Sequence, residues 1–222
     1  KVAFVGKNGE GKSTLVKCIM DEIDFEGKLT IGHNVQIGYF AQNQAQMLDE
    51  NLTVFDTIDR VATGDIRLKI RDILGAFMFG GEASDKKEKV LSGGERTRLA
   101  MIKLLLEPVN LLILDEPTNH LDMDSVIWLE AWLKRQQTTT IIISHDREFL
   151  DRCVNTIWSI EDETIRRYAG NYSAFEALRM ERLRQQDAAA KAYERESAHL
   201  QSFIDRFRYK ATKARQAQSR IK

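Results

Sequence analysis

Apolar positions follow two different periods along residues 1–168, and this alternation predicts a fold built from strands and helices in turn. Short apolar runs of strand length are separated by stretches in which apolar residues recur every three to four positions. The pattern predicts strands at residues 1–5, 28–31, 35–40, 111–115, 138–144, 156–160 and 164–168. It predicts helices at residues 13–20, 53–62, 66–79, 93–107, 122–136 and 146–153, with a loop at 80–90. Strands that alternate with helices favour an α/β fold with a largely parallel sheet, and the last two strands are spaced as a hairpin.

The composition changes after this α/β region. Residues 174–206 contain no Gly or Pro and are rich in Ala, Arg, Glu and Gln. Tyr193, Leu200 and Phe207 recur every seven positions, with Ile204 between them, which is typical of a seam that packs on a second helix. More than thirty helical residues would extend about 50 Å, too long for another layer of the core. We therefore expect a globular domain at residues 1–172 and a projecting helical linker or hairpin at residues 173–222.

Charge is divided unequally between these two parts. The chain has 33 basic and 33 acidic residues, but residues 176–222 hold 12 basic and 6 acidic ones, which leaves the remainder at −6. From Arg206 to Lys222 there are seven basic residues and no acidic one. A basic tail on an acidic body points to a polyanionic partner for the tail.

Several classes of protein fit the sequence poorly. No apolar run approaches the ~18–20 residues that a membrane span needs, and no signal peptide is evident. Cys18 and Cys153 form neither a disulfide framework nor a ligand cluster, so we expect a reducing, cytoplasmic location. The chain opens at Lys1 without a lead-in to its first strand, and we interpret it as a fragment that lacks the N-terminal strands of its domain.

The Gly-rich segment after the first predicted strand matches the phosphate-binding pattern G-x-x-x-x-G-K-[ST]. In this pattern, backbone N–H groups and the N-terminus of the following helix surround phosphate oxygens. Lys12 is predicted to reach the β- and γ-phosphates, and the Ser13 hydroxyl to ligate Mg²⁺. A purely structural Gly-rich turn is the alternative, but a strand before the loop and a helix after it favour phosphate binding. The candidate nucleotide-binding residues here are Gly6, Lys7, Asn8, Gly9, Glu10, Gly11, Lys12, Ser13 and Thr14.

Two further motifs suit nucleotide chemistry. The buried strand LLILD ends in two carboxylates, of which Asp115 can hold the Mg²⁺ shell and Glu116 can polarise an attacking water as general base. A helix cap at a strand end is the alternative for this pair. The segment LSGGERTR, residues 91–98, opens a helix with free N–H groups and the Ser92 hydroxyl, and so offers a second anion site.

Together these motifs resemble the ATP-binding cassette (ABC) ATPases over roughly residues 1–168. The resemblance implies a phosphate-loop ATPase cassette with a mostly parallel sheet and a helical subdomain, and ATP and Mg²⁺ as its cofactors. Gln42 in FAQNQ corresponds to the Q-loop, which binds nucleotide and metal, and Asp122 in NHLD to the D-loop. A lone His after an apolar strand is usually structural. Because the other cassette motifs are present, His145 corresponds to the histidine that contacts the γ-phosphate in this family. Glu116 and His145 are then the catalytic residues.

In this family the signature segment contacts the nucleotide held by another cassette, so each of two composite sites takes half of its residues from each cassette. The resemblance therefore implies a second cassette as partner. The signature residues that would act in trans are Leu91, Ser92, Gly93, Gly94 and Glu95.

Three segments resemble the ABC-F proteins in particular, which are soluble twin-cassette ATPases that act on the ribosome. LDEPTNHLDM at 114–123 is typical of them, and YAGNYSAFEALR at 168–179 matches the place where the chain leaves the first cassette. The basic stretch at 203–222 resembles the linker between cassettes, whose helical hairpin reaches tRNA and the peptidyl-transferase region. The coiled-coil ATPases of chromosome maintenance fit less well, because their helices lie between the phosphate loop and LSGG.

The resemblance implies the ribosome, through rRNA or tRNA, as partner of the tail, with ATP-driven closure of the cassette pair coupled to a translational or ribosome-protection event. The RNA-binding candidates are Arg206, Arg208, Lys210, Lys213 and Arg215. One alternative is the soluble ATPase subunit of an ABC transporter, which docks on separate membrane chains. Another is a non-hydrolytic, ATP-gated clamp, against which the intact Glu116 and His145 count.

A further hypothesis is that the chain is a mosaic. Residues 1–115 have features that we associate with a second cassette, whereas residues 125–222 resemble the end of a first one. The join would fall within LDEPTNHLDM, which both cassettes tend to share. Sequencing the encoding DNA across codons 110–125 in an uninterrupted clone tests this hypothesis, and one continuous read in this order contradicts it.

Overall fold

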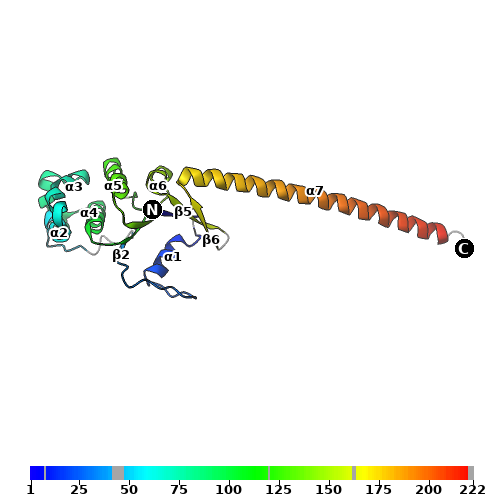
Figure 1. The fold of residues 1–222 in the computed structure, drawn as a ribbon, viewed down its shortest axis with the longest axis horizontal. Helices are drawn as coiled ribbons and strands as arrows, with labels where there is room; N and C mark the ends of the chain where they lie inside the picture. The colour runs from blue at the N-terminus through cyan, green and yellow to red at the C-terminus, as the bar shows by residue number, and fades with distance from the viewer. Residues whose placement is uncertain (8, 42–47, 120, 162–163, 220–222) are drawn as a thin grey trace. The chain divides into compact units, whose positions relative to one another are not determined.

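A computed structural model describes residues 1–7, 9–41, 48–119, 121–161 and 164–219, without the side chains of residues 203, 205 and 207–219 (Figure 1). The chain forms two units, Lys1–Phe175 and Glu176–Lys222. In the part of the chain that is described, no helix is long and apolar enough to cross a membrane.

The first unit is built on a sheet whose strands, among the described residues, follow the order β2-β3-β4-β1-β5-β6. Neighbouring strands from β2 to β5 are parallel, and β5 and β6 form an antiparallel hairpin. The α/β class and the mostly parallel sheet predicted from the sequence are therefore confirmed. The strands are β1 (Val2–Val5), β2 (Ile37–Phe40), β3 (Leu111–Asp115), β4 (Thr139–Ile143), β5 (Thr156–Glu161) and β6 (Thr164–Ala169).

Helices cover both faces of this sheet, and its central strands are accordingly apolar over most of their length. Successive side chains of β3 enter different clusters, Leu112 and Leu114 on one face and Ile113 on the other. Helix α1 supplies Val16 to the cluster of Ile113, and the other helices pack on the opposite face. The helices of this unit are α1 (Lys12–Ile19), α2 (Val54–Val61), α3 (Ile70–Ala76), α4 (Gly93–Leu106), α5 (Met123–Arg135) and α6 (Arg147–Cys153). Short 3₁₀ helices are η2 (Gly64–Lys69), η3 (Gly81–Asp85) and η4 (Glu88–Val90).

Helix starts are fixed by side-chain caps, which satisfy N–H groups that the helix itself leaves open. Thr53, Ser92, Asp122 and Asp146 each accept a hydrogen bond from the backbone N–H three residues ahead. Helix α2 packs on both α3 and α4, and these helices form a layer beside the sheet (Figure 1).

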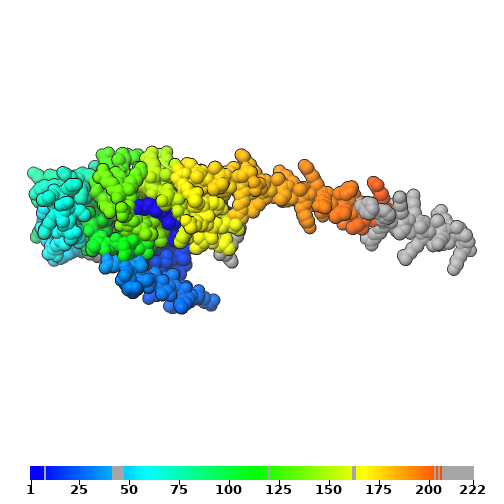
Figure 2. Space-filling view, viewed as in Figure 1, coloured from blue at the N-terminus to red at the C-terminus, as the bar shows by residue number. Residues whose placement is uncertain are grey.

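Some sequence predictions were wrong. Residues 28–31 do not form a strand; Leu29 and Ile31 are 44% and 41% exposed, and no described strand pairs with them. An apolar alternation without a partner strand cannot satisfy its backbone groups in a sheet. Residues 24–36 lie exposed on the surface of the unit (blue in Figure 2). The helix predicted at 66–79 is divided into η2 and α3, and the predicted loop at 80–90 contains η3 and η4.

Helix α7 (Tyr172–Ser219) begins in the first unit and forms most of the second. Its 48 residues exceed the length predicted from the sequence and extend about 72 Å at 1.5 Å per residue. Near its start, Phe175 is buried against the rings of Tyr168 and Tyr172. Further along, the residues of the heptad seam are exposed, with Tyr193 at 74% and Leu200 at 54%.

Candidate functional site

The candidate site lies where the parallel strands end. Phe4 of β1 pairs with Ile143 of β4, and Asp115 of β3 pairs with the same residue from the other side. These pairings bring the residues that follow β1, β3 and β4 to one edge of the sheet. The carboxyl edge is where open α/β sheets bind their ligands.

The phosphate loop turns from β1 into α1 through backbone conformations that favour glycine. Gly9 and Gly11 have φ values of 88° and 87°, in the left-handed region. Gly11 is the N-cap of α1 and offers no side chain to its first turn. Gly11 therefore does not cap the first N–H groups of α1, and these groups can donate hydrogen bonds to an anion.

Lys12 and Glu10 brace the loop from within. The Lys12 ammonium donates to the carbonyl oxygens of Gly6 at 2.7 Å and Lys7 at 3.0 Å. The Glu10 carboxylate accepts a hydrogen bond from the Lys7 backbone N–H. The carbonyl oxygens satisfy the Lys12 ammonium only in part, because a charged phosphate forms stronger hydrogen bonds with an ammonium than a carbonyl does.

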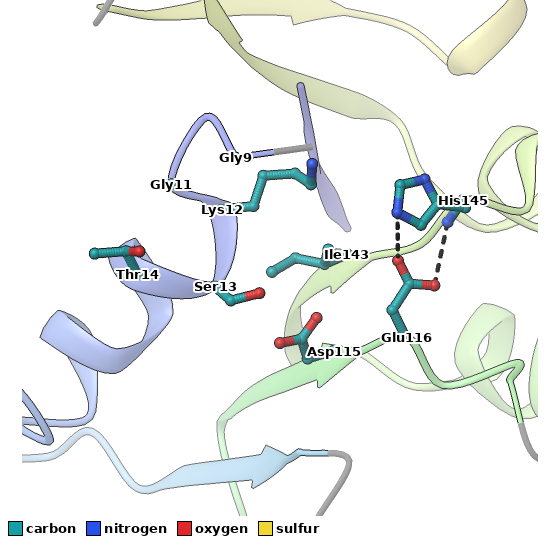
Figure 3. Close-up of a pocket in the computed structure, with 9 residues that line it drawn as sticks. All are labelled: Gly9, Gly11, Lys12, Ser13, Thr14, Asp115, Glu116, Ile143 and His145. Carbon is teal, nitrogen blue, oxygen red and sulfur yellow. Dashed lines mark hydrogen bonds and ion pairs between the residues drawn. The ribbon is translucent and has the colours of Figure 1, made fainter. Parts of the chain in front are cut away.

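A pocket of about 370 Å³ opens beside this loop (Figure 3). It is lined by Gly9 and residues 11–14 of the loop and α1, by Asp115 and Glu116 after β3, and by Ile143 and His145 at the end of β4. Lys12 therefore shares one cavity with two carboxylates and an imidazole.

Asp115 and Ser13 face each other across this pocket (Figure 3). Burial has the largest effect on Asp115 and raises the pKa of its carboxyl, although a hydrogen bond with Ser13 and the charge of Lys12 act in the opposite direction. A hydroxyl and a carboxylate are oxygen ligands of the kind that Mg²⁺ accepts beside nucleotide phosphates. The residues present therefore fit a Mg²⁺ ion that accompanies a bound nucleotide.

Glu116 is held in an unusual conformation by its neighbours. Its φ of 51° is left-handed, which is uncommon for a residue other than glycine, and its N–H donates to the Ile143 carbonyl at 2.8 Å. One carboxylate oxygen accepts the His145 backbone N–H at 3.3 Å, and the other lies 3.3 Å from His145 Nε2 (Figure 3). Burial raises the pKa of Glu116, and the contacts with His145 oppose this shift. A raised pKa makes a carboxylate a better proton acceptor.

The signature segment lies outside this pocket. Ser92 caps α4 by accepting the Glu95 N–H at 3.3 Å, and the Glu95 carboxylate accepts the Ser92 N–H at 2.7 Å. This reciprocal capping box lowers the pKa of Glu95. Ser92, Gly93 and Gly94 are exposed and do not line the pocket of their own chain, whereas Leu91 is buried.

Asp122 caps α5 through hydrogen bonds from the N–H and hydroxyl of Ser125. Burial alone would raise the pKa of Asp122, but the hydrogen bonds from Ser125 outweigh it and the pKa is lowered. The side chain thus has a clear structural role in the single chain.

The structure brings together Lys12, Ser13, Asp115, Glu116 and His145, which the sequence had pointed to from three separate motifs. Gly6, Lys7 and Glu10 shape the loop without lining the pocket, and Asn8 and Gln42 lie outside the described residues. Sequence reasoning missed Ile143, whose only signal was its place at the end of an apolar strand. Among the RNA-binding candidates, Arg206 is exposed on α7. The structure does not describe the side chains of the other four candidates, Arg208, Lys210, Lys213 and Arg215.

A phosphate loop at the carboxyl edge of a parallel sheet, opposite an acidic strand end, defines a phosphate-loop nucleotide-binding protein. A family model described as ABC transporter matches residues 1–119, and an extension model with the same description matches residues 158–222. The chain belongs to the ATP-binding cassette family, whose cassettes hydrolyse ATP and work in pairs.

Similar proteins place the cassette in the ABC-F type. The probable ATP-binding protein YheS of Escherichia coli K12 is 42% identical over 253 residues, which cover 100% of this chain and 40% of YheS. ABC transporter F family member 5 of Arabidopsis thaliana is 42% identical over 199 residues, covering 89% of this chain and 28% of that protein. The chain thus spans about 40% of the length of YheS.

Solved structures share the fold at lower identity. An ATP-binding subunit of an ABC transporter has a TM-score of 0.63 at 18% identity, over 76% of this chain and 78% of that one. The archaeal ribosome recycling factor aABCE1, solved with ribosomal stalk protein aP1, has a TM-score of 0.60 at 23% identity, over 71% of this chain and 31% of that one.

Lys12 should contribute strongly to nucleotide affinity. Replacing it in a Lys12→Ala variant removes a charge-assisted bond to phosphate worth ~1.5–3 kcal/mol, or about tenfold to a hundredfold in the Kd for Mg·ATP. Calorimetric titration measures this change, with Lys28→Ala, which removes the same charge from the exposed segment 24–36, as the matched control. Equal affinities of the Lys12 variant and the wild type would show that the phosphates bind elsewhere.

Proposed function

We propose that this protein binds Mg·ATP in the pocket beside the phosphate loop and hydrolyses it. The observation that carries the proposal is the placement of Glu116, whose carboxylate shares the cavity with Lys12 and is contacted through both oxygens by His145. A carboxylate held this way is preorganised before substrate arrives, so little reorganisation is needed at the moment of reaction.

In the proposed reaction, a water molecule attacks the γ-phosphorus and passes its proton to Glu116, while the bond between the γ-phosphorus and the bridging oxygen breaks. The products are ADP and inorganic phosphate. Lys12 exchanges the carbonyls of Gly6 and Lys7 for phosphate oxygens and offsets their charge. Ser13 and Asp115, with Gln42, would hold Mg²⁺, which when bound neutralises charge on the phosphates. His145 keeps the Glu116 carboxylate in place and would contact the γ-phosphate.

The proposal includes a second cassette. Ser92, Gly93 and Gly94 are exposed and lie outside the pocket of their own chain, which supports a role at the nucleotide of a partner. Asp122 is proposed to face the partner at the same junction. ATP would then join two cassettes, and hydrolysis would release them.

Hydrolysis by the isolated chain should rise more steeply than linearly with protein concentration, because Ser92 must come from a second molecule. Phosphate release measured from nanomolar to micromolar protein gives the order in protein. Full activity with a strictly linear dependence at nanomolar concentration would mean that one chain suffices.

We also propose that the protein acts on the ribosome, in the cytoplasm, as a translation or ribosome-protection factor. The ABC-F type of its relatives and the basic end of α7 support this role. Phe207 and Tyr209 lie among the basic residues in sequence, and such rings can stack on unpaired RNA bases while Arg and Lys contact phosphate. A transporter subunit is the main alternative, and it would co-purify with a membrane protein rather than sediment with ribosomes.

The tail should bind RNA with a marked dependence on salt. If about four of its seven basic residues contact phosphate, log affinity for tRNA or rRNA falls with log salt at a slope of roughly −3 to −4. Replacing Arg206, Arg208, Lys210 and Lys213 by Gln should flatten this slope and leave ATP affinity unchanged.

The matched control removes the same charge from the earlier part of α7, by Gln at Arg182, Arg184, Lys191 and Arg195, and should keep the slope. Filter binding across salt concentrations measures both variants. Wild-type binding no tighter than that of the tail variant at low salt would remove the RNA role and favour the transporter alternative.

A further inference from the structure

The segment that leads into the signature is fastened to the segment that precedes and opens α2. The Val54 N–H donates to the Lys86 carbonyl at 3.0 Å, and the Glu88 N–H donates to the Leu52 carbonyl at 2.9 Å. Between these two bonds, Thr53 and Lys87 form an isolated antiparallel bridge. A short two-stranded contact thus joins parts of the chain more than thirty residues apart.

Glu88 adds a side-chain link at this contact. It is only 1% exposed, and it hydrogen bonds to the hydroxyl of Thr57, which lies in α2 and is 5% exposed. The other carboxylate oxygen, Oε2, has no hydrogen-bond partner among the residues that the structure describes. Burying a carboxyl with one oxygen unpaired is costly, and an apolar side chain of similar size would avoid that cost.

The hydroxyl of Thr57 is shared between Glu88 and the backbone of the preceding turn. It contacts both Glu88 and the Thr53 carbonyl, the latter at 3.0 Å, but it carries a single proton. Burial raises the pKa of Glu88, and the hydrogen bond from Thr57 opposes this shift. The Thr57 hydroxyl thus links Glu88 to the backbone at the start of α2.

Three residues separate Glu88 from Ser92, and further contacts hold them in place. The Leu91 N–H donates to the Glu88 carbonyl at 3.1 Å, and Leu91 itself is buried. Arg96, in the first turns of α4, donates to the Lys89 carbonyl at 3.3 Å. The capping box of Ser92 follows immediately, so only a short segment held by hydrogen bonds lies between Glu88 and the exposed signature residues.

We propose that Glu88 and Thr57 form a positioning pair that sets the location of Ser92 for its action on the nucleotide of a second cassette. The inference rests on the proposed pairing of cassettes. It has a specific consequence, because loss of the pair damages the site of the partner and leaves the phosphate loop of the same chain intact.

Thr57→Val removes the hydroxyl at nearly constant shape, and Thr57→Ser keeps it. The Val variant should lose about tenfold to a hundredfold in kcat for ATP hydrolysis, the range expected when a reacting group is slightly misplaced, with Mg·ATP affinity unchanged. The Ser variant should recover most of the wild-type rate. Equal kcat for the Val variant and the wild type would overturn the proposal.

Glu88→Met is the second variant, and it separates positioning from stability. Met has the length of Glu without its unpaired oxygen, so the thermal unfolding midpoint should stay level or rise. The rate of hydrolysis should nevertheless fall as in the Val variant. If the hydrolysis rate of Glu88→Met stays level or rises together with its unfolding midpoint, Glu88 has a structural role alone.

Mixing experiments locate the damage. Thr57→Val chains mixed with Lys12→Ala chains should recover hydrolysis well above either alone, because the intact loop of one meets the intact signature of the other. Thr57→Val mixed with Ser92→Ala should not recover, because both lack a working signature.

A mixture of Lys12→Ala chains with Ser92→Ala chains is the control for the proposed pairing of cassettes. If this control mixture stays inactive, the pairing of cassettes is wrong. If it recovers and the mixture of Thr57→Val with Lys12→Ala does not, the pairing stands and the positioning role is overturned.

Discussion

The parallel pairing of β3, β4 and β1 is the constraint on which the site depends. Ile143 is the register partner of both Phe4 and Asp115, so the chain leaves all three strands at the same edge. Residues separated by about a hundred positions in sequence thereby line one pocket. Because apolar side chains on both faces set this pairing, the geometry of the pocket is maintained by the core rather than by the charged groups themselves.

The charged groups, by contrast, are poorly satisfied in the single chain. Burial raises the pKa values of both Asp115 and Glu116, and Lys12 is paired with backbone carbonyls rather than with a carboxylate. Bound phosphates would complement Lys12 and Mg²⁺ would complement Asp115, which gives nucleotide binding a ready source of free energy. The backbone of Glu116 is also strained, with a left-handed φ. Strain of this kind persists where the surrounding structure holds a residue in place, and it is frequent at functional sites.

Much of this arrangement could be predicted from the sequence. The phosphate loop, the strand ending in Asp115 and Glu116, and the helix opened by Ser92 each carry a local signal, and the alternation of strands with helices indicates the parallel sheet. Contacts between distant segments carry no such signal. Leu29 and Ile31 had the alternation of a strand without a partner, and the bond between Thr57 and Glu88 joins residues that no local pattern connects. The length of α7 was underestimated, although residues 174–219 contain neither Gly nor Pro to end the helix earlier.

The claim that two cassettes share each nucleotide is tested most directly with a Glu116→Gln variant, which keeps the shape of the site and removes the base. Analytical ultracentrifugation with Mg·ATP, and separately with Mg·ADP, measures its mass in solution. The account predicts a dimer that retains uncleaved ATP and is absent with ADP. A variant that binds ATP and remains a monomer at micromolar concentration would contradict it.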